Sequence, residues 1–234
     1  MLPGEIVFRL WDTYGFPVEM TREVAAEKEV TVDMEGFERE MEAQRERGRA
    51  TARFGGDRAK IRVYEGLGVG GTRFLGYEQL TASSVVVGLV TGDEAVTGVS
   101  EGSEVEVVLV ETPFYPEGGG QIGDAGELVG PNGKVEVRDT QMVMPDLIVQ
   151  FGAVRQGSVA LGDTLEAYVD PLRREDTARN HTATHLLHAG LRQILGPHVR
   201  QAGSLVAPDR LRFDFTHVQA MTEDEIWQVQ WLVN

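Results

Sequence analysis

Two histidines one helical turn apart are the residues of this sequence best placed to do chemistry. His181 and His185 lie in the run His-Thr-Ala-Thr-His. Residues at i and i+4 share one face of a helix, so both imidazoles can reach a single ion. Thr182 stands where metalloproteases carry a general-base Glu, which excludes that chemistry. The pair predicts either part of a metal site or a histidine pair that holds no metal.

Further ligands for such an ion are scarce in the sequence. A zinc site needs at least three protein ligands. The remaining histidines are His188, His198 and His217, and nothing in the sequence places either of the last two near the pair. The chain has no Cys, which excludes a disulfide framework, a thiolate nucleophile and a cysteine ligand. The sequence therefore supplies half of a zinc site.

A glycine-rich loop is the second feature that could carry chemistry. Gly118, Gly120 and Gly123 satisfy the dinucleotide-binding pattern G-x-G-x-x-G, but Asp-Ala-Gly follows them where a helix would have to begin. No Gly-Lys-Ser/Thr is present, which excludes a phosphate-binding P-loop. Two interpretations stay open: a tight turn that needs positive φ, or a loop whose backbone approaches a substrate while Gln121 presents its amide.

The elements that must position these residues lie in the last third of the chain. Apolar spacing predicts a helix over residues 171–195, ended by Gly-Pro, and this helix carries the histidine pair. Alternating runs at 204–206 and 211–215 predict two half-buried strands, with Arg212 and Asp214 on the polar side. A capping box at Thr222 opens a last helix.

Two other zones precede this one. Residues 1–53 read as helices, with Pro3 in a first turn and with Thr21 and Asp33 as N-caps. The zone up to residue 170 holds short Val-rich runs separated by turn signals, the strongest being Pro-Asn-Gly at 131–133. The fold class is α+β, and the three predicted parts are a helical segment at 1–56, a small antiparallel β-barrel at 57–170 and a two-layer α/β unit at 171–234, left incomplete.

Composition narrows the classes of protein that fit. The 234 residues include 22 Lys and Arg against 37 Asp and Glu, a net charge of 22 − 37 = −15. This balance argues against indiscriminate nucleic-acid binding, so any RNA contact must be local. No apolar run approaches the roughly 18–20 residues that span a bilayer, and no secretory leader is visible, so we expect a cytoplasmic protein without a membrane partner. The one dense basic stretch contains Arg45, Arg47, Arg49, Arg53 and Arg58.

Four motifs together resemble the alanyl-tRNA synthetase family, in the family's order. Residues 10–17 resemble the end of its aminoacylation region. The other three resemble its editing domain: residues 114–124, residues 180–187, and residues 203–206 through 212–215. The resemblance covers nearly the whole chain. It implies an internal segment that runs from the tRNA-recognising helical region into the first part of the editing domain.

The resemblance also implies an activity. The editing domain hydrolyses the aminoacyl ester of mischarged Ser-tRNA(Ala) or Gly-tRNA(Ala), with tRNA(Ala) as the partner and zinc as the cofactor. In the family a later Cys-x-x-x-His element completes the zinc site, and we expect those ligands beyond Asn234. The ATP site belongs to the ligase core, whose motifs do not occur in this chain.

The family's functional residues map onto positions of this sequence. His181 and His185 are implied as metal ligands, and Gln121 is implied as a residue of the reacting site together with Gly119 and Gly120 of its loop. Residues implied or suggested to contact the substrate are Thr182, Thr184, Arg212 and Asp214.

Two other functions stay open. One is a non-catalytic module that binds and orients tRNA through the basic stretch and the barrel. The other is a free-standing deacylase that acts in trans, although such proteins resemble only the editing half and residues 1–53 speak against it.

Overall fold

The computed structural model describes residues 1–14, 16, 18–28, 30–41 and 58–234. The chain forms two compact units, Met1–Arg58 and Ala59–Asn234, which are described separately. Among the described residues, no helix has both the length and the apolar character needed to cross a membrane. The predicted division at residue 170 stays a prediction.

The first unit is helical, as expected. Helix α1 spans Gly4–Tyr14, α2 spans Val18–Glu27, and residues 34–41 form a further helix. Val7 and Phe8 of α1 are buried together with Phe37 of this further helix. The predicted cap at Asp33 is confirmed, because its Oδ1 accepts a hydrogen bond from the Gly36 N–H at 2.9 Å.

The predicted cap at Thr21 is wrong. Helix α2 begins at Val18, so Thr21 lies inside the helix, where its residue surface is 3% exposed. The four arginines from Arg45 to Arg53 and the expected boundary at residues 54–57 lie outside the described residues.

The second unit opens with a helix that the sequence did not predict. Helix α4 spans Arg58–Gly66. Its Tyr64 is buried, and the hydroxyl donates to Glu106 Oε2 at 2.6 Å. Lys60 Nζ lies 2.6 Å from the other oxygen of the same carboxylate. Tyr64 packs with Val90, Val108 and Val149 of the sheet, so α4 covers one side of it.

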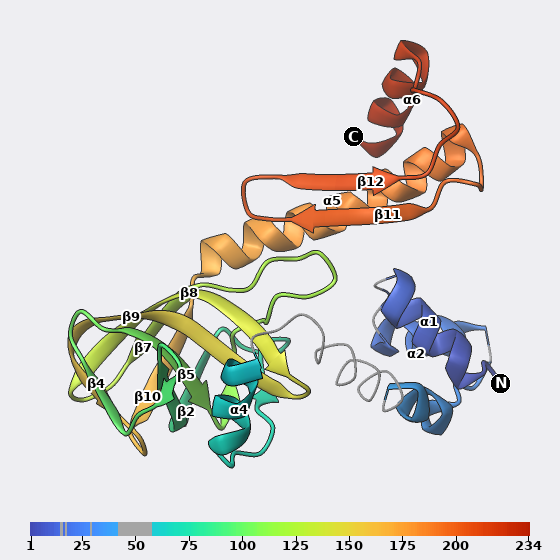
Figure 1. Cartoon of the computed structure of the whole chain (residues 1–234). Helices are drawn as coiled ribbons and strands as arrows, with labels where there is room; N and C mark the ends of the chain where they lie inside the picture. Colours follow the sequence, from blue (N-terminus) through green and yellow to red (C-terminus); the bar gives the residue numbers. More distant parts are fainter. Residues whose placement is uncertain (15, 17, 29, 42–57) are drawn as a thin grey trace. The chain divides into compact units, whose positions relative to one another are not determined.

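A closed antiparallel barrel forms the centre of this unit (Figure 1). Six strands pair in the order β10-β7-β8-β9-β5-β2, and β10 then pairs with β2 to close the ring. Their bounds are β2 Thr81–Thr91, β5 Glu104–Leu109, β7 Gly126–Val129, β8 Gly133–Met144, β9 Leu147–Ala160 and β10 Thr164–Val169. Four short strands lie outside the ring: β1 Arg73–Phe74, β3 Glu94–Ala95, β4 Gly98–Ser100 and β6 Glu111–Thr112.

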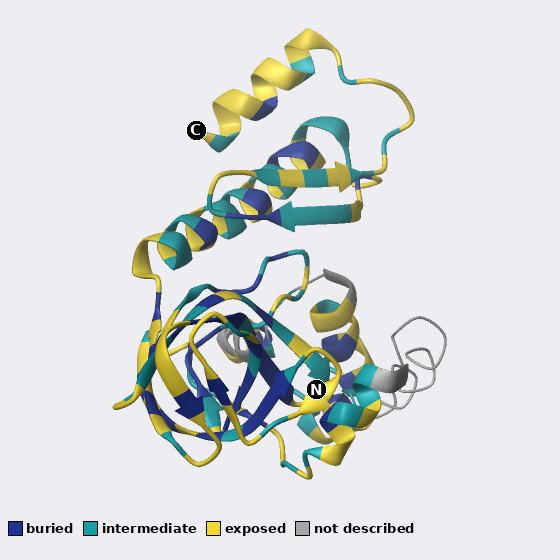
Figure 2. Cartoon of the chain, turned by 60° about the vertical axis from the view of Figure 1, so that its left-hand side comes forward, coloured by how far each residue is buried: buried dark blue, intermediate teal, exposed yellow. Residues whose placement is uncertain are grey.

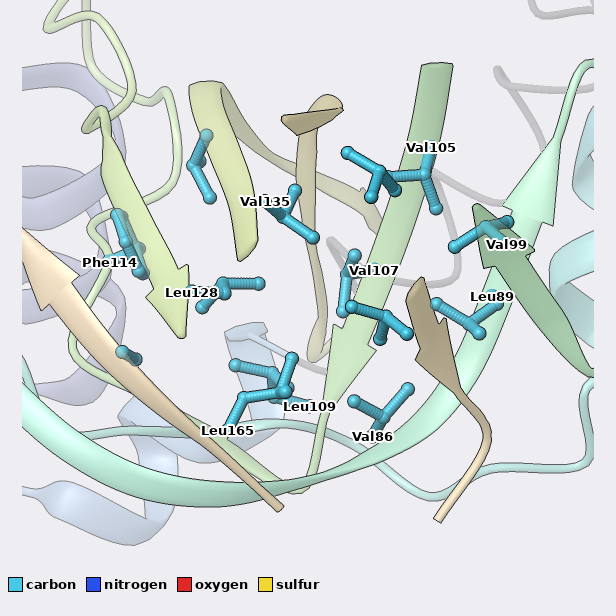
Figure 3. Packing of buried hydrophobic residues seen from close by; sticks show 14 of the residues in the cluster. Val86, Leu89, Val99, Val105, Val107, Leu109, Phe114, Leu128, Val135 and Leu165 are labelled. Atoms are coloured by element: carbon cyan, nitrogen blue, oxygen red, sulfur yellow. The ribbon is translucent and has the colours of Figure 1, made fainter. Parts of the chain in front are cut away.

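Apolar side chains from all around the ring fill the barrel interior (Figure 3). Leu89, Leu109, Phe114, Leu128 and Leu165 have no exposed surface. Buried and exposed residues alternate along β10, as expected for a strand with one face toward the core. The hairpin predicted at Pro-Asn-Gly is confirmed, because β7 and β8 pair across it in register from Gly126↔Val137 to Val129↔Lys134.

A long helix and a hairpin follow the barrel. Helix α5 spans Pro171–Leu195, and the Asp170 side chain caps it by accepting from the Arg173 N–H at 3.0 Å. Strands β11 (Gln201–Val206) and β12 (Leu211–Phe215) form the hairpin, and α6 (Glu223–Val233) begins with the predicted capping box at Thr222. Leu191, Val199 and Val229 form the small core between these elements, while most of α6 is exposed (Figure 2).

The chain therefore mixes helices with an antiparallel barrel, which confirms the coarse fold prediction.

The barrel core should dominate the stability of the second unit. We expect Leu128→Ala to lower the free energy of unfolding by about 2–5 kcal/mol, because it removes buried methyl groups and leaves a cavity. The exposed Leu161, with 48% of its surface accessible, provides the matched control, and Leu161→Ala should change stability by less than about 0.5 kcal/mol. Urea unfolding of both variants measures the difference. Equal losses would contradict the assignment of the core.

Candidate functional site

The glycine loop between β6 and β7 forms a tight turn. Gly118 and Gln121 exchange two backbone hydrogen bonds, 3.0 Å from the Gly118 N–H to the Gln121 carbonyl and 2.9 Å in the other direction. The two residues between them have positive φ, +60° at Gly119 and +85° at Gly120. Positive φ at both central positions defines a type I′ turn. The expectation of a turn that requires positive φ is therefore confirmed.

The same turn lies directly against β11. The Val206 N–H donates to the Gly120 carbonyl at 2.7 Å, and the Ile122 N–H donates to the Val206 carbonyl at 3.1 Å. A Cβ on Gly120 would lie 2.3 Å from Ser204 Oγ and 2.6 Å from the Ser204 carbonyl oxygen. Glycine is therefore needed at position 120 for two separate reasons, its φ angle and the closeness of Ser204.

The histidine pair lies on α5 with its ring nitrogens converging. His181 Nε2 and His185 Nε2 are 3.1 Å apart, and the ring centroids are 5.0 Å apart. Two nitrogen ligands at 2.0–2.1 Å from one tetrahedral zinc ion lie about 3.3 Å from each other. The helical spacing thus brings the two nitrogens to nearly the separation that a shared ion requires.

Gln121 connects the turn to the histidine pair. Its Oε1 lies 2.7 Å from His181 Nδ1, and because an amide oxygen only accepts, Nδ1 carries the proton and donates. The lone pair of the neutral ring is then on Nε2, the nitrogen that faces His185. Burial lowers the pKa of His181, and the neighbouring His185 lowers it further, so the neutral ring is favoured.

The two threonines between the histidines bond to their own helix. Thr182 Oγ1 donates to the Ala178 carbonyl at 3.0 Å, and Thr184 Oγ1 donates to the Asn180 carbonyl at 2.8 Å. Thr182 is exposed and Thr184 is buried. Such back-bonding is the ordinary behaviour of Thr in a helix. Their suggested contact with a substrate stays a prediction.

Arg212 and Asp214 lie on the other face of the hairpin. The ring of Phe213, between them in β12, packs against His188 of α5 in a tilted arrangement with centroids 5.0 Å apart. Because successive side chains of a strand alternate between faces, Arg212 and Asp214 point away from α5 and pair with each other, Arg212 Nε donating to Asp214 Oδ2 at 3.1 Å. The structure does not bring them to the histidine pair, and their role in substrate binding stays a prediction.

Three polar residues that the sequence analysis did not select help to build the site. Asn180 Nδ2 donates to the carbonyls of Ala207 at 2.7 Å and Pro208 at 3.2 Å, which joins α5 to the β11–β12 turn. Arg174 and Asp124 form an ion pair between α5 and the end of the glycine loop. Only Arg174 carries a sequence signal, since a cation in the first turn of a helix is unfavourable.

His181 and His185 fit half of a zinc site. Imidazole nitrogens are suitable zinc ligands, and the Nε2 separation suits one ion. No group of three or more His, Cys, Asp or Glu that could hold a metal occurs among the residues that the structure describes.

Comparison with known proteins assigns the family. The family model described as class II (A) tRNA synthetases matches residues 1–173 of this chain. The chain belongs to the class II tRNA synthetases. It is 51% identical over 238 residues to an alanine–tRNA ligase of Thermus thermophilus, 49% over 234 residues to one of Roseiflexus sp., and 47% over 236 residues to one of Chloroflexus aurantiacus.

These alignments cover all of this chain but only 26–27% of each relative. The chain thus spans about a quarter of the length of the alanine–tRNA ligases that it matches. The resemblance predicted from the four motifs is confirmed. The matched region ends at residue 173, within the first turn of α5. The histidine pair lies further along the same helix, just past the matched region.

The turn gives a test that separates backbone strain from close packing. Gly120 and Gly102 have nearly the same φ, +85° and +87°, but nothing lies within 4 Å of a Cβ at Gly102. We expect Gly102→Ala to cost about 1–2 kcal/mol from the φ angle alone. Gly120→Ala should cost more, because Ser204 and its backbone must also move. Urea unfolding measures both, and equal costs would refute the tight contact with β11.

Proposed function

We propose that this chain carries part of an editing site that hydrolyses the aminoacyl ester of mischarged tRNA(Ala). The observation that carries the proposal is the convergence of His181 and His185 Nε2 beside the glycine turn that Gln121 joins to them. The relatives are alanine–tRNA ligases, and this supplies the substrate class. On this proposal, residues 171–234 are the first part of a two-layer α/β editing unit, and Ser-tRNA(Ala) and Gly-tRNA(Ala) are its substrates.

A physical need for such a site supports the proposal. A pocket shaped for alanine admits the smaller glycine, and it rejects serine weakly because serine only adds a hydroxyl. Such differences are worth about 1–3 kcal/mol, a selectivity of 10–200-fold. A second, hydrolytic site raises the overall selectivity by destroying the wrong ester. The site must spare Ala-tRNA(Ala). A hydrogen bond to the serine hydroxyl would select the serine ester, because alanine has no hydroxyl to make it.

His181 and His185 would hold a zinc ion, completed by ligands outside this chain. A zinc ion in such a site polarises a carbonyl oxygen and lowers the pKa of bound water. Gln121 would keep the Nε2 lone pair of His181 directed at the ion by accepting from Nδ1. Outer hydrogen-bond partners of this kind orient a ligand and make it a better donor.

The glycine turn would contribute backbone donors. The hydrogen-bond pair that closes the turn uses the N–H groups of Gly118 and Gln121, so the N–H groups of Gly119 and Gly120 take no part in it. Two such N–H groups can stabilise the negative charge that develops on the ester oxygen during hydrolysis. Nothing lies within 4 Å of a Cβ at Gly119, so the missing side chain there would let the substrate approach the backbone.

Single-turnover hydrolysis with zinc supplied tests the proposal. We expect this chain, or a chain extended past Asn234, to hydrolyse Ser-tRNA(Ala) and to spare Ala-tRNA(Ala). His181→Ala and His185→Ala should each lower the rate by at least about 100-fold, the loss that follows when a metal site is disrupted.

A second histidine pair provides the matched control. His198 Nε2 lies 2.8 Å from His217 Nδ1, away from the glycine turn in the sequence and on different elements. His198→Ala should leave the rate unchanged. Undiminished hydrolysis in His181→Ala would remove the pair from the reaction. If neither this chain nor the chain extended past Asn234 hydrolyses the ester, but both still bind tRNA, the result would favour the non-catalytic tRNA-binding function instead.

A further inference from the structure

A buried ion pair joins α5 to the barrel two helical turns before the histidines. The side chain of Arg174 is 17% exposed and that of Asp124 is 5% exposed. Arg174 lies in the first turn of α5, which contains no acidic residue. The N-terminus of a helix carries partial positive charge, so a cation is unfavourable there. A buried cation at this place must therefore be held by its partners.

Those partners come from three segments of the barrel. The Nε of Arg174 donates to both carboxylate oxygens of Asp124 at 3.0 Å, and Nη2 also donates to Oδ2. The other donors reach two backbone carbonyls, Nη1 to Gly76 at 2.8 Å and Nη2 to Pro113 at 2.9 Å. Asp124 Oδ2 accepts in addition from the Tyr115 N–H at 2.7 Å. One guanidinium thus holds both ends of the loop that carries the glycine turn.

The spacing along α5 relates this ion pair to the site. Arg174 and His181 are seven residues apart, which places them on one face of the helix, about 10 Å apart along its axis. Asp124 follows Gln121 by three residues on the loop. The loop therefore contacts a single face of α5 at two points, Asp124 at Arg174 and Gln121 at His181.

We propose that Arg174 and Asp124 are positioning residues, which set where Gln121 meets His181. The pair lies outside the strand ladder that closes the barrel, so its contribution is to fix the loop against α5. Its distance from the histidines keeps it from touching the reacting groups. The effect on ester hydrolysis rests on the proposed function, whereas the effect on the Gln121–His181 hydrogen bond does not.

Nitrogen NMR of the His181 ring in this chain, without zinc or tRNA, tests the positioning role directly. The intact chain should show the Nδ1–H tautomer with a slowly exchanging proton. We expect Asp124→Asn and Arg174→Gln each to speed exchange of that proton by at least about tenfold, because the hydrogen bond to Gln121 opens more often. Arg174→Lys keeps the charge but loses the fork of donors, so it should restore only part of the protection.

Two matched controls separate positioning from general loss of stability. Arg155→Gln breaks an exposed ion pair of the barrel, in which Arg155 Nε donates to Glu136 at 2.8 Å, and it should leave the His181 proton unchanged. Val135→Ala weakens the barrel core. Where Val135→Ala and the ion-pair variants lower Tm equally, Val135→Ala should leave the His181 Nδ1 proton protected from exchange. Equal loss of protection in Val135→Ala would overturn the proposal, because the ion pair would then act only through overall stability.

Hydrolysis gives the second readout. Asp124→Asn should lower the single-turnover rate on Ser-tRNA(Ala) by about tenfold in the intact chain, and by much less in a Gln121→Ala background, because the two changes act through one contact. Fully additive losses would overturn the positioning role. If the unchanged chain does not hydrolyse the ester, the proposed function fails, and the His181 exchange rate alone decides the positioning role.

Discussion

Closure of the barrel is the constraint on which the geometry of the site depends. Strand β10 completes the ring by pairing with β2 and β7, and the chain continues from β10 directly into α5. The Val169 N–H donates to the Leu80 carbonyl and the Asp170 N–H to the Ala125 carbonyl, both at 2.9 Å. The Asp170 side chain then caps the helix. The two residues immediately before α5 are thus tied to the barrel from both sides.

Once the start of α5 is fixed, the position of the histidines follows from helix geometry. His181 is ten residues after Pro171, about 15 Å along the axis. The glycine turn comes from a different part of the barrel and must extend to the level of His181 along α5. It is held there by pairing with β11 at Val206. A site made from residues 121, 181 and 206 forms only when the whole unit has folded, because no local segment contains all three.

Local signals allowed much of this fold to be predicted. Helix α5 begins at Pro171 and ends before Gly196, as its caps and apolar spacing indicated, and the turn at residues 131–133 joins β7 to β8. Helix α4 was missed because it is short, and its burial rests on tertiary partners, Tyr64 and Lys60 with Glu106. Thr21 was misplaced because Thr occurs both at helix N-caps and inside helices, and the sequence alone does not distinguish the two positions.

The histidine pair and the glycine turn were visible in the sequence, but the contact between them was not. Gln121 and His181 are 60 residues apart, and neither spacing nor composition indicates such a long-range hydrogen bond. Arg174 and Asp124 escaped attention for the same reason. Two cations, Arg173 and Arg174, stand at the helix start, where a cation is unfavourable, but the sequence does not show that a buried carboxylate faces Arg174.

The two histidine pairs of this chain show why surroundings, rather than residue type, define a site. His198 and His217 also bring ring nitrogens together, at 2.8 Å from Nε2 to Nδ1, and in both pairs the separation is one at which one ring donates to the other. In the α5 pair the Gln121 amide oxygen accepts from Nδ1 of His181, so the lone pair of His181 is on Nε2, which accepts from His185 Nε2. A third residue, Gln121, thus fixes the tautomer of His181 and leaves the lone pair on Nε2. The preorganisation therefore comes from the barrel loop, and the helix alone would supply only the spacing.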